Sequence, residues 1–153
     1  GTEALSTLRI EMGHIAGSEL DGRTIPYDNS LEGLVSKKKD FIGKRSLDRE
    51  AFIAKDRQKV VGVVPIDKKT SIPEGSHLVK DALAPIPNPK LGYISASCWS
   101  VEYDNPFSLA ILKDGKNMIG QKLFAMSPLK NKTIPVEIVS SHYVDPKGER
   151  VRS

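Results

Sequence analysis

The hydrophobic and polar positions along the chain follow the period of a helix near its beginning and that of strands further on. Leu5, Leu8 and Met12 recur at the spacing of one face of an α-helix. Gly13 follows them, as glycine commonly does after the last helical turn. The pattern predicts a helix over residues 2–12 whose apolar face is formed by these three side chains.

A loop-like region and a second helix come next. Residues 16–36 are rich in Gly, Asp, Asn and Pro, so a long loop is expected there. Ser46 is a candidate N-cap for a short helix over residues 46–54. The apolar contacts of this helix would come from Leu47, Phe52 and Ile53.

Six later segments have the character of short strands, because each is apolar or β-branched and is bounded by Gly, Pro, Asn or Asp. They are residues 60–64, 77–80, 91–98, 108–112, 122–126 and 133–140. In the last of them, Ile134, Val136 and Ile138 alternate with more polar positions, as in a half-buried strand. Pro135 cannot donate a ladder hydrogen bond, so we expect it at a sheet edge or a bulge. The succession of short strands predicts a small antiparallel barrel or sandwich.

Length and composition are those of a folded chain. The 153 residues, 39% of them hydrophobic, suffice for one domain or two small modules and are too apolar for a disordered chain. No stretch approaches the roughly 20 apolar residues of a bilayer-spanning helix, and the first residues lack the pattern of a secretory signal. With one cysteine, Cys98, and three scattered histidines, neither an internal disulfide nor a zinc site is expected. We therefore expect a cytoplasmic protein with no metal and no membrane partner.

The net charge of +4 is unevenly distributed. Residues 1–58 carry ten acidic and ten basic side chains, whereas residues 59–153 carry nine acidic and thirteen basic ones. The basic residues are mostly isolated lysines between strand-like segments, without interleaved aromatic side chains. Two interpretations remain: solvated lysines that protect strand edges, or a surface that attracts an acidic ligand or partner. Binding of nucleic acid is not expected from this pattern.

Few residues carry chemistry by themselves. The chain has no glycine-rich phosphate loop and no Gly-x-Ser-x-Gly elbow. Cys98 has no neighbouring base in the sequence and fits a packed apolar residue better than a reactive thiol. Glu11 lies at the margin of the apolar helix face, either in solvent or beside a pocket. Trp99 belongs either to the core or to one wall of a site for a flat ligand. These residue types alone indicate no particular reaction.

Several motifs resemble the glycine-cleavage aminomethyltransferase family. Leu8-Arg9-Ile10-Glu11 and the loop over residues 21–26 are similar to the Leu-Arg-x-Glu helix and the Thr-x-Pro loop of that family. Residues 40–47, Asp-Phe-Ile-Gly-Lys-Arg-Ser-Leu, resemble the element that follows this loop. Further landmarks occur in family order at Gly62, Pro73-Glu74-Gly75, residues 91–95 and residues 109–111. The resemblance covers nearly the whole chain and implies an α+β fold: a small N-terminal α+β segment followed by an antiparallel Greek-key β-barrel of about six strands.

Two motifs resemble one branch of this family, the α subunits of heterotetrameric sarcosine oxidases. These motifs are residues 97–100, Ser-Cys-Trp-Ser, and residues 143–150, Tyr-Val-Asp-Pro-Lys-Gly-Glu-Arg. The branch implies an enzyme that oxidatively demethylates sarcosine to glycine and passes the one-carbon unit to tetrahydrofolate as 5,10-methylenetetrahydrofolate. FAD, FMN and NAD are expected elsewhere in such a complex, and the partners are the other subunits and the upstream domains of the α subunit.

The resemblance also implies a division of the chain and a set of site residues. Residues 1–58 would end a folate-binding domain, and residues 59–153 would form the C-terminal barrel domain. No residue matches the catalytic aspartate of the family, so we expect a C-terminal fragment that is inactive alone. Glu11 would accept hydrogen bonds from the pterin ring, because a carboxylate can accept two parallel N–H bonds. Arg57 would contact the glutamyl carboxylate of folate, and Trp99 would lie near the pocket or pack in the barrel.

Two other functions are compatible with the same motifs. The first is a glycine-cleavage aminomethyltransferase, or a relative that oxidises dimethylglycine. The second is a non-catalytic module for folate binding or assembly. An upstream dinucleotide-binding region would favour the sarcosine oxidase branch over both.

Overall fold

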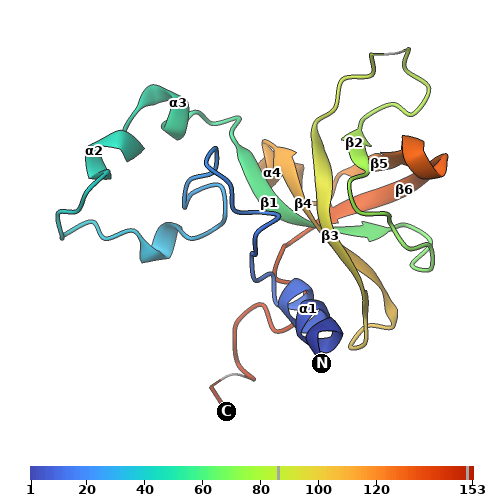
Figure 1. Cartoon of the computed structure of the whole chain (residues 1–153), viewed down its shortest axis with the longest axis horizontal. Helices are drawn as coiled ribbons and strands as arrows, with labels where there is room; N and C mark the ends of the chain where they lie inside the picture. Colours follow the sequence, from blue (N-terminus) through green and yellow to red (C-terminus); the bar gives the residue numbers. More distant parts are fainter. Residues whose placement is uncertain (86, 151) are drawn as a thin grey trace.

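Six antiparallel strands close into a barrel in the computed structural model, which describes residues 1–85, 87–150 and 152–153 (Figure 1). The strands are β1 (Gln58–Pro65), β2 (His77–Val79), β3 (Gly92–Ser100), β4 (Asn105–Lys113), β5 (Lys122–Ser127) and β6 (Lys132–Val139). Their order around the barrel is β1-β4-β3-β2-β5-β6, and β6 pairs back onto β1. The first four strands have Greek-key order, because β2, β3 and β4 are neighbours in sequence while β1 lies beside β4. The predicted six-stranded barrel and the α+β fold class are confirmed.

The helices are short and lie outside the barrel. They are α1 (Thr2–Glu11), η1 (Glu32–Leu34), α2 (Lys44–Leu47), α3 (Glu50–Ile53), α4 (Gly115–Met118) and η2 (Pro128–Lys130). The prediction of one helix over residues 46–54 is wrong, because the chain is extended at Arg49 and two four-residue helices form instead. Neither of them has a buried residue, so no packing interaction joins them into one longer helix.

The apolar side chains form two layers. Alternate residues of β1 point to opposite sides, so Val61 and Val63 fill the barrel interior while Val60 and Val64 face outward. The outer layer covers β1, β3 and β4 and includes Ile10 from α1. Because β4 contributes to both layers, eight of its nine residues are buried.

Helix α1 docks on this outer layer through its last turn. Ile10 and Glu11 are the buried residues of α1, whereas Leu5 and Leu8 are 68% and 58% exposed. The helix is therefore present as predicted, but the expected apolar face is wrong. Residues close to the helix C-terminus contact the barrel, and the first two turns extend away from it.

Pro135 lies at a local edge of the sheet, as expected, because β6 pairs with β5 there while its pairing with β1 begins only at the next residue, Val136. It pairs with Phe124 in β5, and its carbonyl accepts a hydrogen bond from Ile66 N at 3.0 Å. In an antiparallel ladder, the nitrogen of a residue points to the same neighbour as its carbonyl. The nitrogen of Pro135 therefore faces the place where β1 has already ended, and no ladder donor is lost there.

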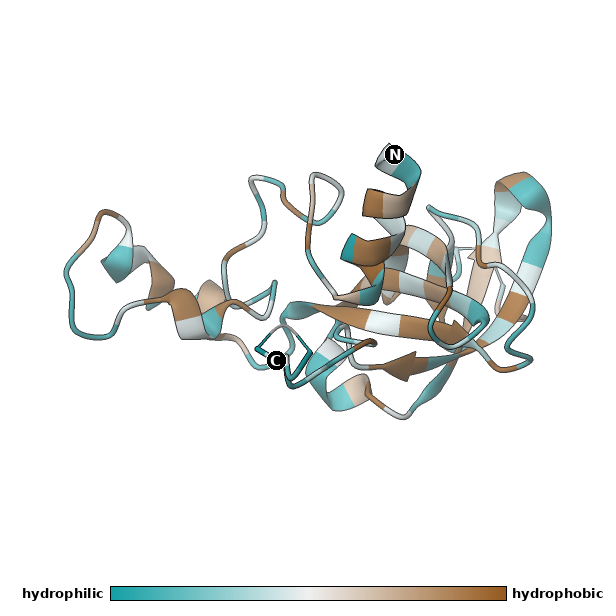
Figure 2. Cartoon of the chain, turned by 90° about the horizontal axis from the view of Figure 1, so that it is seen from below, coloured by the Kyte–Doolittle hydropathy of each residue, from teal (hydrophilic) through white to brown (hydrophobic). Residues whose placement is uncertain are grey.

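Residues 14–57 extend from the barrel as an arm (Figures 1 and 2). The buried residues of this arm are all polar: Glu19, Asp28 and Asn29. Large apolar side chains of the arm are exposed instead, with Leu34 at 80% and Ile42 at 105% exposure. Ile15 packs on the outer layer of the barrel, the other contacts described here are polar, and the arm has no apolar core of its own.

Candidate functional site

The carboxyl group of Glu11 is buried where α1 meets the turn between β3 and β4. Glu11 is 5% exposed, and its Oε1 accepts hydrogen bonds from Ser100 Oγ at 2.6 Å and from Val101 N at 2.9 Å. Both donors lie about 90 residues away in the chain, at the end of β3. Glu11 is therefore neither a solvated side chain nor a residue at the margin of an apolar face.

The two oxygens of Glu11 differ in their surroundings. Both hydrogen bonds go to Oε1, and no described residue donates to Oε2. Within the described part of the chain, the fully buried side-chain atom that lacks a partner is Asn29 Oδ1. Oε2 of Glu11 also lacks a hydrogen-bond partner, but it is not among the fully buried atoms without one. It therefore keeps some contact with solvent. Oε2 is thus the acceptor that Glu11 can offer to a ligand.

A C-terminal strap, residues 141–150, holds the end of α1 against the barrel. The carbonyl oxygen of Glu11 accepts hydrogen bonds from Tyr143 N at 3.2 Å and Val144 N at 3.0 Å. The Tyr143 ring stacks on Phe107, with 4.2 Å between ring centroids, and its hydroxyl donates to Asn105 Oδ1. The strap therefore fixes the main chain of Glu11, and the β3–β4 turn fixes its side chain.

The strap ends in a turn that returns to the β3–β4 connection. Asp145 has a left-handed backbone (φ 49°), and its carboxylate accepts hydrogen bonds from the main-chain nitrogens of Glu149 and Arg150. This turn directs the Arg150 side chain to Glu102, where the ion pair measures 2.6 Å. The Glu102 carboxylate raises the pKa of Arg150, and the guanidinium in turn lowers the pKa of Glu102.

Trp99 is on the surface near this end of the barrel. Its side chain is 45% exposed, and its Nε1 donates to Asp104 Oδ1 at 3.2 Å. Trp99 is therefore not part of the core, and its ring is available to a flat ligand. Cys98, the next residue, is half-buried; burial, with a further contribution from the Glu11 carboxylate, raises the pKa of its thiol to about 11. Such a thiol stays protonated at neutral pH, in agreement with the expectation that it is not reactive.

Arg57 occupies a different place, immediately before β1. Its Nε donates to Asp28 Oδ1 at 2.7 Å, its Nη2 donates to Asp28 Oδ2, and its Nη1 donates to the carbonyl of Ala51 at 2.9 Å. Hydrogen bonding to the Asp28 carboxylate raises the pKa of Arg57. A guanidinium has five N–H donors, so two remain beyond these three bonds. Arg57 thus joins the arm to the barrel and still has donors for a ligand.

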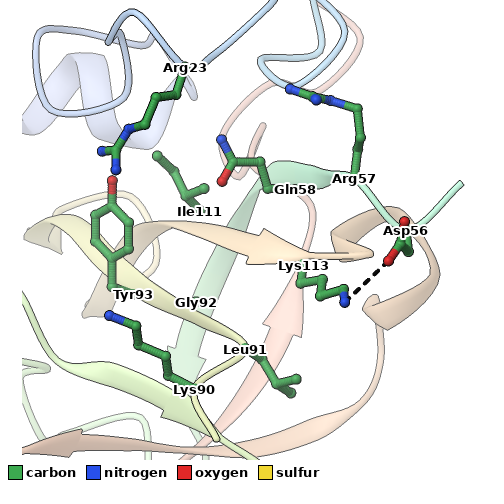
Figure 3. Close-up of a pocket in the computed structure, with 10 residues that line it drawn as sticks. All are labelled: Arg23, Asp56, Arg57, Gln58, Lys90, Leu91, Gly92, Tyr93, Ile111 and Lys113. Carbon is green, nitrogen blue, oxygen red and sulfur yellow. Dashed lines mark ion pairs between the residues drawn. The ribbon is translucent and has the colours of Figure 1, made fainter. Parts of the chain in front are cut away.

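A cavity of about 540 Å³ opens beside Arg57 (Figure 3). Four of its ten lining residues are cationic, namely Arg23, Arg57, Lys90 and Lys113. Among the described residues that line it, one is acidic, Asp56, which forms an ion pair with Lys113 at 3.2 Å. The guanidinium of Arg23 points toward the hydroxyl of Tyr93 (Figure 3). Three of these cations are each paired with a carboxylate, Arg23 with Asp21, Arg57 with Asp28 and Lys113 with Asp56, so Lys90 and the unused donors of the paired side chains are what the cavity offers to an anionic group.

The structure brings Glu11 and Trp99 to one end of β4 and Arg57 to the other. Ser100 pairs with Asn105 at the first end, and Gln58 pairs with Lys113 at the second. The eight residue steps from Asn105 to Lys113 correspond to roughly 26 Å at the rise of an antiparallel strand. A ligand that touches all three predicted residues must therefore be elongated.

Sequence reasoning missed the residues that surround these positions. Ser100 and Tyr143 lie in the two motifs of the sarcosine oxidase branch, but nothing in the motifs connects them to Glu11. Lys90 and Lys113 flank the paired ends of β3 and β4, and recognition of that hairpin would have placed them together. Among the described residues, no three His, Cys, Asp or Glu side chains form a group that could hold a metal ion. No helix in the described part of the chain has the length and apolar character needed to cross a bilayer.

The barrel with its N-terminal extension has the fold of part of an aminomethyltransferase. The glycine cleavage system aminomethyltransferase T of Bartonella henselae superposes with a TM-score of 0.75, over 94% of this chain and 38% of that chain, at 20% sequence identity. No family model matches the chain.

The sequence relatives identify the branch. The sarcosine oxidase α subunit of Rhizobium meliloti (strain 1021) is 38% identical over 153 residues, and that of Corynebacterium sp. (strain U-96) is 37% identical. A probable mitochondrial aminomethyltransferase of Schizosaccharomyces pombe is 24% identical over 150 residues. This chain is thus homologous to a segment of sarcosine oxidase α subunits, and the resemblance predicted from the motifs is confirmed. It spans 15% to 16% of the length of these α subunits, while 98% to 99% of the chain itself is covered.

Proposed function

We propose that this chain is the folate-binding C-terminal part of a sarcosine oxidase α subunit. The whole enzyme would oxidise sarcosine to glycine and transfer the one-carbon unit to tetrahydrofolate as 5,10-methylenetetrahydrofolate. The observation that carries the proposal is the Glu11 carboxyl group, which is anchored through Oε1 while no described residue donates a hydrogen bond to Oε2. This arrangement suits a flat heterocycle with N–H donors on one edge.

The contact of Glu11 with the pterin ring would be made through Oε2. A carboxylate oxygen has about two acceptor positions, and Oε1 already uses two, with Ser100 and Val101. The aminopyrimidine edge would therefore donate to Oε2 rather than to both oxygens in parallel. Trp99, on the same end of the barrel, would contribute an apolar surface to the ring or to the aminobenzoyl group that follows it.

The anionic tail of folate would lie in the cationic cavity. Arg57 keeps two unused donors, and Lys90 and the Asp21-paired Arg23 line the same cavity. The separation of this cavity from Glu11 is compatible with an elongated ligand whose heterocycle and carboxylates are at opposite ends. No residue of this chain is assigned a catalytic role, and FAD, FMN and NAD would be bound elsewhere in the complex.

The division of the chain at residue 58 is also a proposal. Residues 1–58 would complete a neighbouring folate-binding domain, and residues 59–153 would form the barrel domain. This is supported by the exposed apolar side chains of the arm and of α1, among them Leu34, Ile42 and Leu8, which a second domain would cover. Upstream domains of the α subunit and the other oxidase subunits are therefore the partners that we propose, and the isolated chain would be inactive.

The sarcosine oxidase branch is favoured over the alternatives by sequence similarity. Identity is 36% to 38% with three sarcosine oxidase α subunits and 24% with the probable aminomethyltransferase. A non-catalytic folate-binding module would retain folate affinity without supporting one-carbon transfer.

The Glu11→Gln substitution in the full-length enzyme complex tests the proposal. We expect sarcosine oxidation to be unchanged and formation of 5,10-methylenetetrahydrofolate to fall about tenfold or more, because a charge-assisted hydrogen bond to the pterin is lost. Oxygen uptake and folate product are measured in parallel. Glu3→Gln, on an exposed position of the same helix, is the matched control. Equal loss of both activities in Glu11→Gln would overturn the proposed role.

A further inference from the structure

We propose that Ser100 is a positioning residue that holds the Glu11 carboxylate in the orientation used for folate. This inference rests on the proposed function and adds a residue that does not itself touch the ligand. Ser100 is fully buried and lies at the end of β3, and its hydroxyl donates to Glu11 Oε1 at 2.6 Å.

The direction of this hydrogen bond is determined by the surroundings of Ser100. A carboxylate can only accept hydrogen bonds, so the serine hydroxyl must donate its single hydrogen to Glu11. The same hydroxyl oxygen accepts a hydrogen bond from Tyr103 N at 3.4 Å. Ser100 thus accepts one hydrogen bond from its own turn and donates one to Glu11, and the reverse direction is excluded because the carboxylate has no donor.

Glu11 needs such donors because of where it lies in α1. It is the last residue of the helix, and a carboxylate at a helix C-terminus faces the negative end of the helix dipole. Fixing a glutamate side chain in one rotamer also costs conformational entropy. The two donors, Ser100 Oγ and Val101 N, hold Oε1 from adjacent residues of one turn. With Oε1 fixed and the helix end held by the strap, Oε2 has one position before the ligand arrives, which reduces the ordering cost of binding.

The support beneath Ser100 is itself rigid. Ser100 pairs with Asn105 across the β3–β4 ladder, and the side chain of Asn105 hydrogen-bonds the Tyr143 hydroxyl. The Tyr143 ring stacks on Phe107, which is fully buried. Ser100 is therefore connected, through Asn105, to the stacked rings of Tyr143 and Phe107. The same rings hold the strap, which in turn holds the main chain of Glu11.

A double-mutant cycle in the full-length enzyme complex tests the role of Ser100. The dissociation constant of tetrahydrofolate is measured by calorimetry for the wild type, Ser100→Ala, Glu11→Gln and the double variant. Because Val101 N remains as a donor, we expect Ser100→Ala alone to weaken binding about tenfold. In the Glu11→Gln background, the same substitution should weaken binding less than twofold, since the orientation of this side chain no longer matters once the oxygen that meets the pterin N–H groups is replaced by an NH2 group, which cannot accept them.

The matched control is Ser97→Ala. Ser97 lies on the same strand, and its hydroxyl forms a 2.9 Å hydrogen bond with Ser108 that does not involve Glu11. We expect this variant to keep the wild-type affinity for tetrahydrofolate, and thermal unfolding of all variants reports any general loss of structure.

The outcomes separate this inference from the function on which it rests. If Glu11→Gln leaves the affinity unchanged, the proposed folate contact is wrong. If Glu11→Gln weakens binding while Ser100→Ala behaves like Ser97→Ala, the folate contact stands and the role of Ser100 is overturned. Additive effects of the two substitutions would also overturn it, because Ser100 would then act independently of Glu11.

Discussion

Arg57 and Asp28 form an ion pair in which two guanidinium nitrogens meet both carboxylate oxygens, across 29 positions in the chain. Asp28 is 2% exposed, so this pair joins the arm to the barrel at a place that water barely reaches. The guanidinium also lies 5.2 Å from the centre of the Phe52 ring, which adds a cation–π contact from α3.

Removal of the cation from this pair is expected to destabilise the chain strongly. In Arg57→Met the Asp28 carboxylate stays buried without its partner, and the free energy of unfolding should fall by about 3 kcal/mol. Urea unfolding measures this change. The control is Arg23→Met, because the Arg23–Asp21 pair is exposed and should contribute nothing measurable. Equal stability of the two variants would contradict a structural role for Arg57.

Stability at low pH is expected to depend on Glu19. Burial would raise its pKa, but the hydroxyl groups of Ser95 and Ser18, the main-chain nitrogen of Ala16 and the charge of Arg9 together hold the pKa below its ordinary value. A group with a lowered pKa in the folded state stabilises the fold above its unfolded pKa, and this contribution is lost as the pH falls through the folded pKa. Wild type should therefore exceed Glu19→Gln in unfolding free energy at about pH 7, and the difference should shrink as the pH falls below the ordinary pKa of a glutamate. A pH-independent difference would show that the carboxylate charge is not involved.

Cys98 should report the charge of Glu11. Burial and the nearby carboxylate raise the pKa of the thiol to about 11, so alkylation of the native chain at neutral pH should be slow and should accelerate in denaturant. In Glu11→Gln the negative charge is absent, the pKa of Cys98 should fall, and alkylation at about pH 9 should become a few times faster. Mass spectrometry follows the modification. Glu3→Gln should react at the wild-type rate, and identical rates in all three proteins would place Glu11 too far from the thiol.

Gly62 should not tolerate a side chain. A Cβ atom there would lie 2.3 Å from the Ser140 carbonyl oxygen and 2.8 Å from the Phe107 ring, which is stacked under Tyr143. Gly62→Ala should lower the free energy of unfolding by about 2 kcal/mol or more, because main chain has to move. Gly33→Ala is the control, since a Cβ there meets nothing within 4 Å. Thermal denaturation of both variants measures the effect, and equal melting temperatures would contradict the close approach at Gly62.

Local patterns predicted the barrel well and the candidate site poorly, for one physical reason. Alternation such as that of Ile134, Val136 and Ile138 is set by strand geometry and is visible within a few residues. The burial of Glu11 depends instead on Ser100, which lies 89 positions away. The helical spacing by itself predicted that Leu5 and Leu8 form the buried face, but both are exposed. No short-range signal in the sequence shows that the last turn of the helix is the part that contacts the barrel.

The resemblance to a family identified Glu11, Arg57 and Trp99 as candidates but not their surroundings. In the structure, Glu11 accepts a hydrogen bond from Ser100, and Arg57 donates to Asp28. Both contacts join residues far apart in the sequence, and a short motif does not encode them. The helix over residues 46–54 was predicted as one element, although the structure has two shorter helices there. Its residues have sufficient helix propensity, but no packing partner in this chain extends them into one helix.

In the arm, polar side chains are buried and large apolar side chains are exposed. The fraction of molecules with an ordered arm therefore depends on the concentration of a second surface that covers these apolar side chains. Burial of Leu34 and Ile42 by a second surface would contribute roughly 4 kcal/mol, which is about a thousandfold in an equilibrium constant. A segment of this kind melts at a temperature that rises with the concentration, or the effective concentration, of whatever covers it. Its melting therefore measures the occupancy of its surface, while the melting of the barrel measures the stability of the chain.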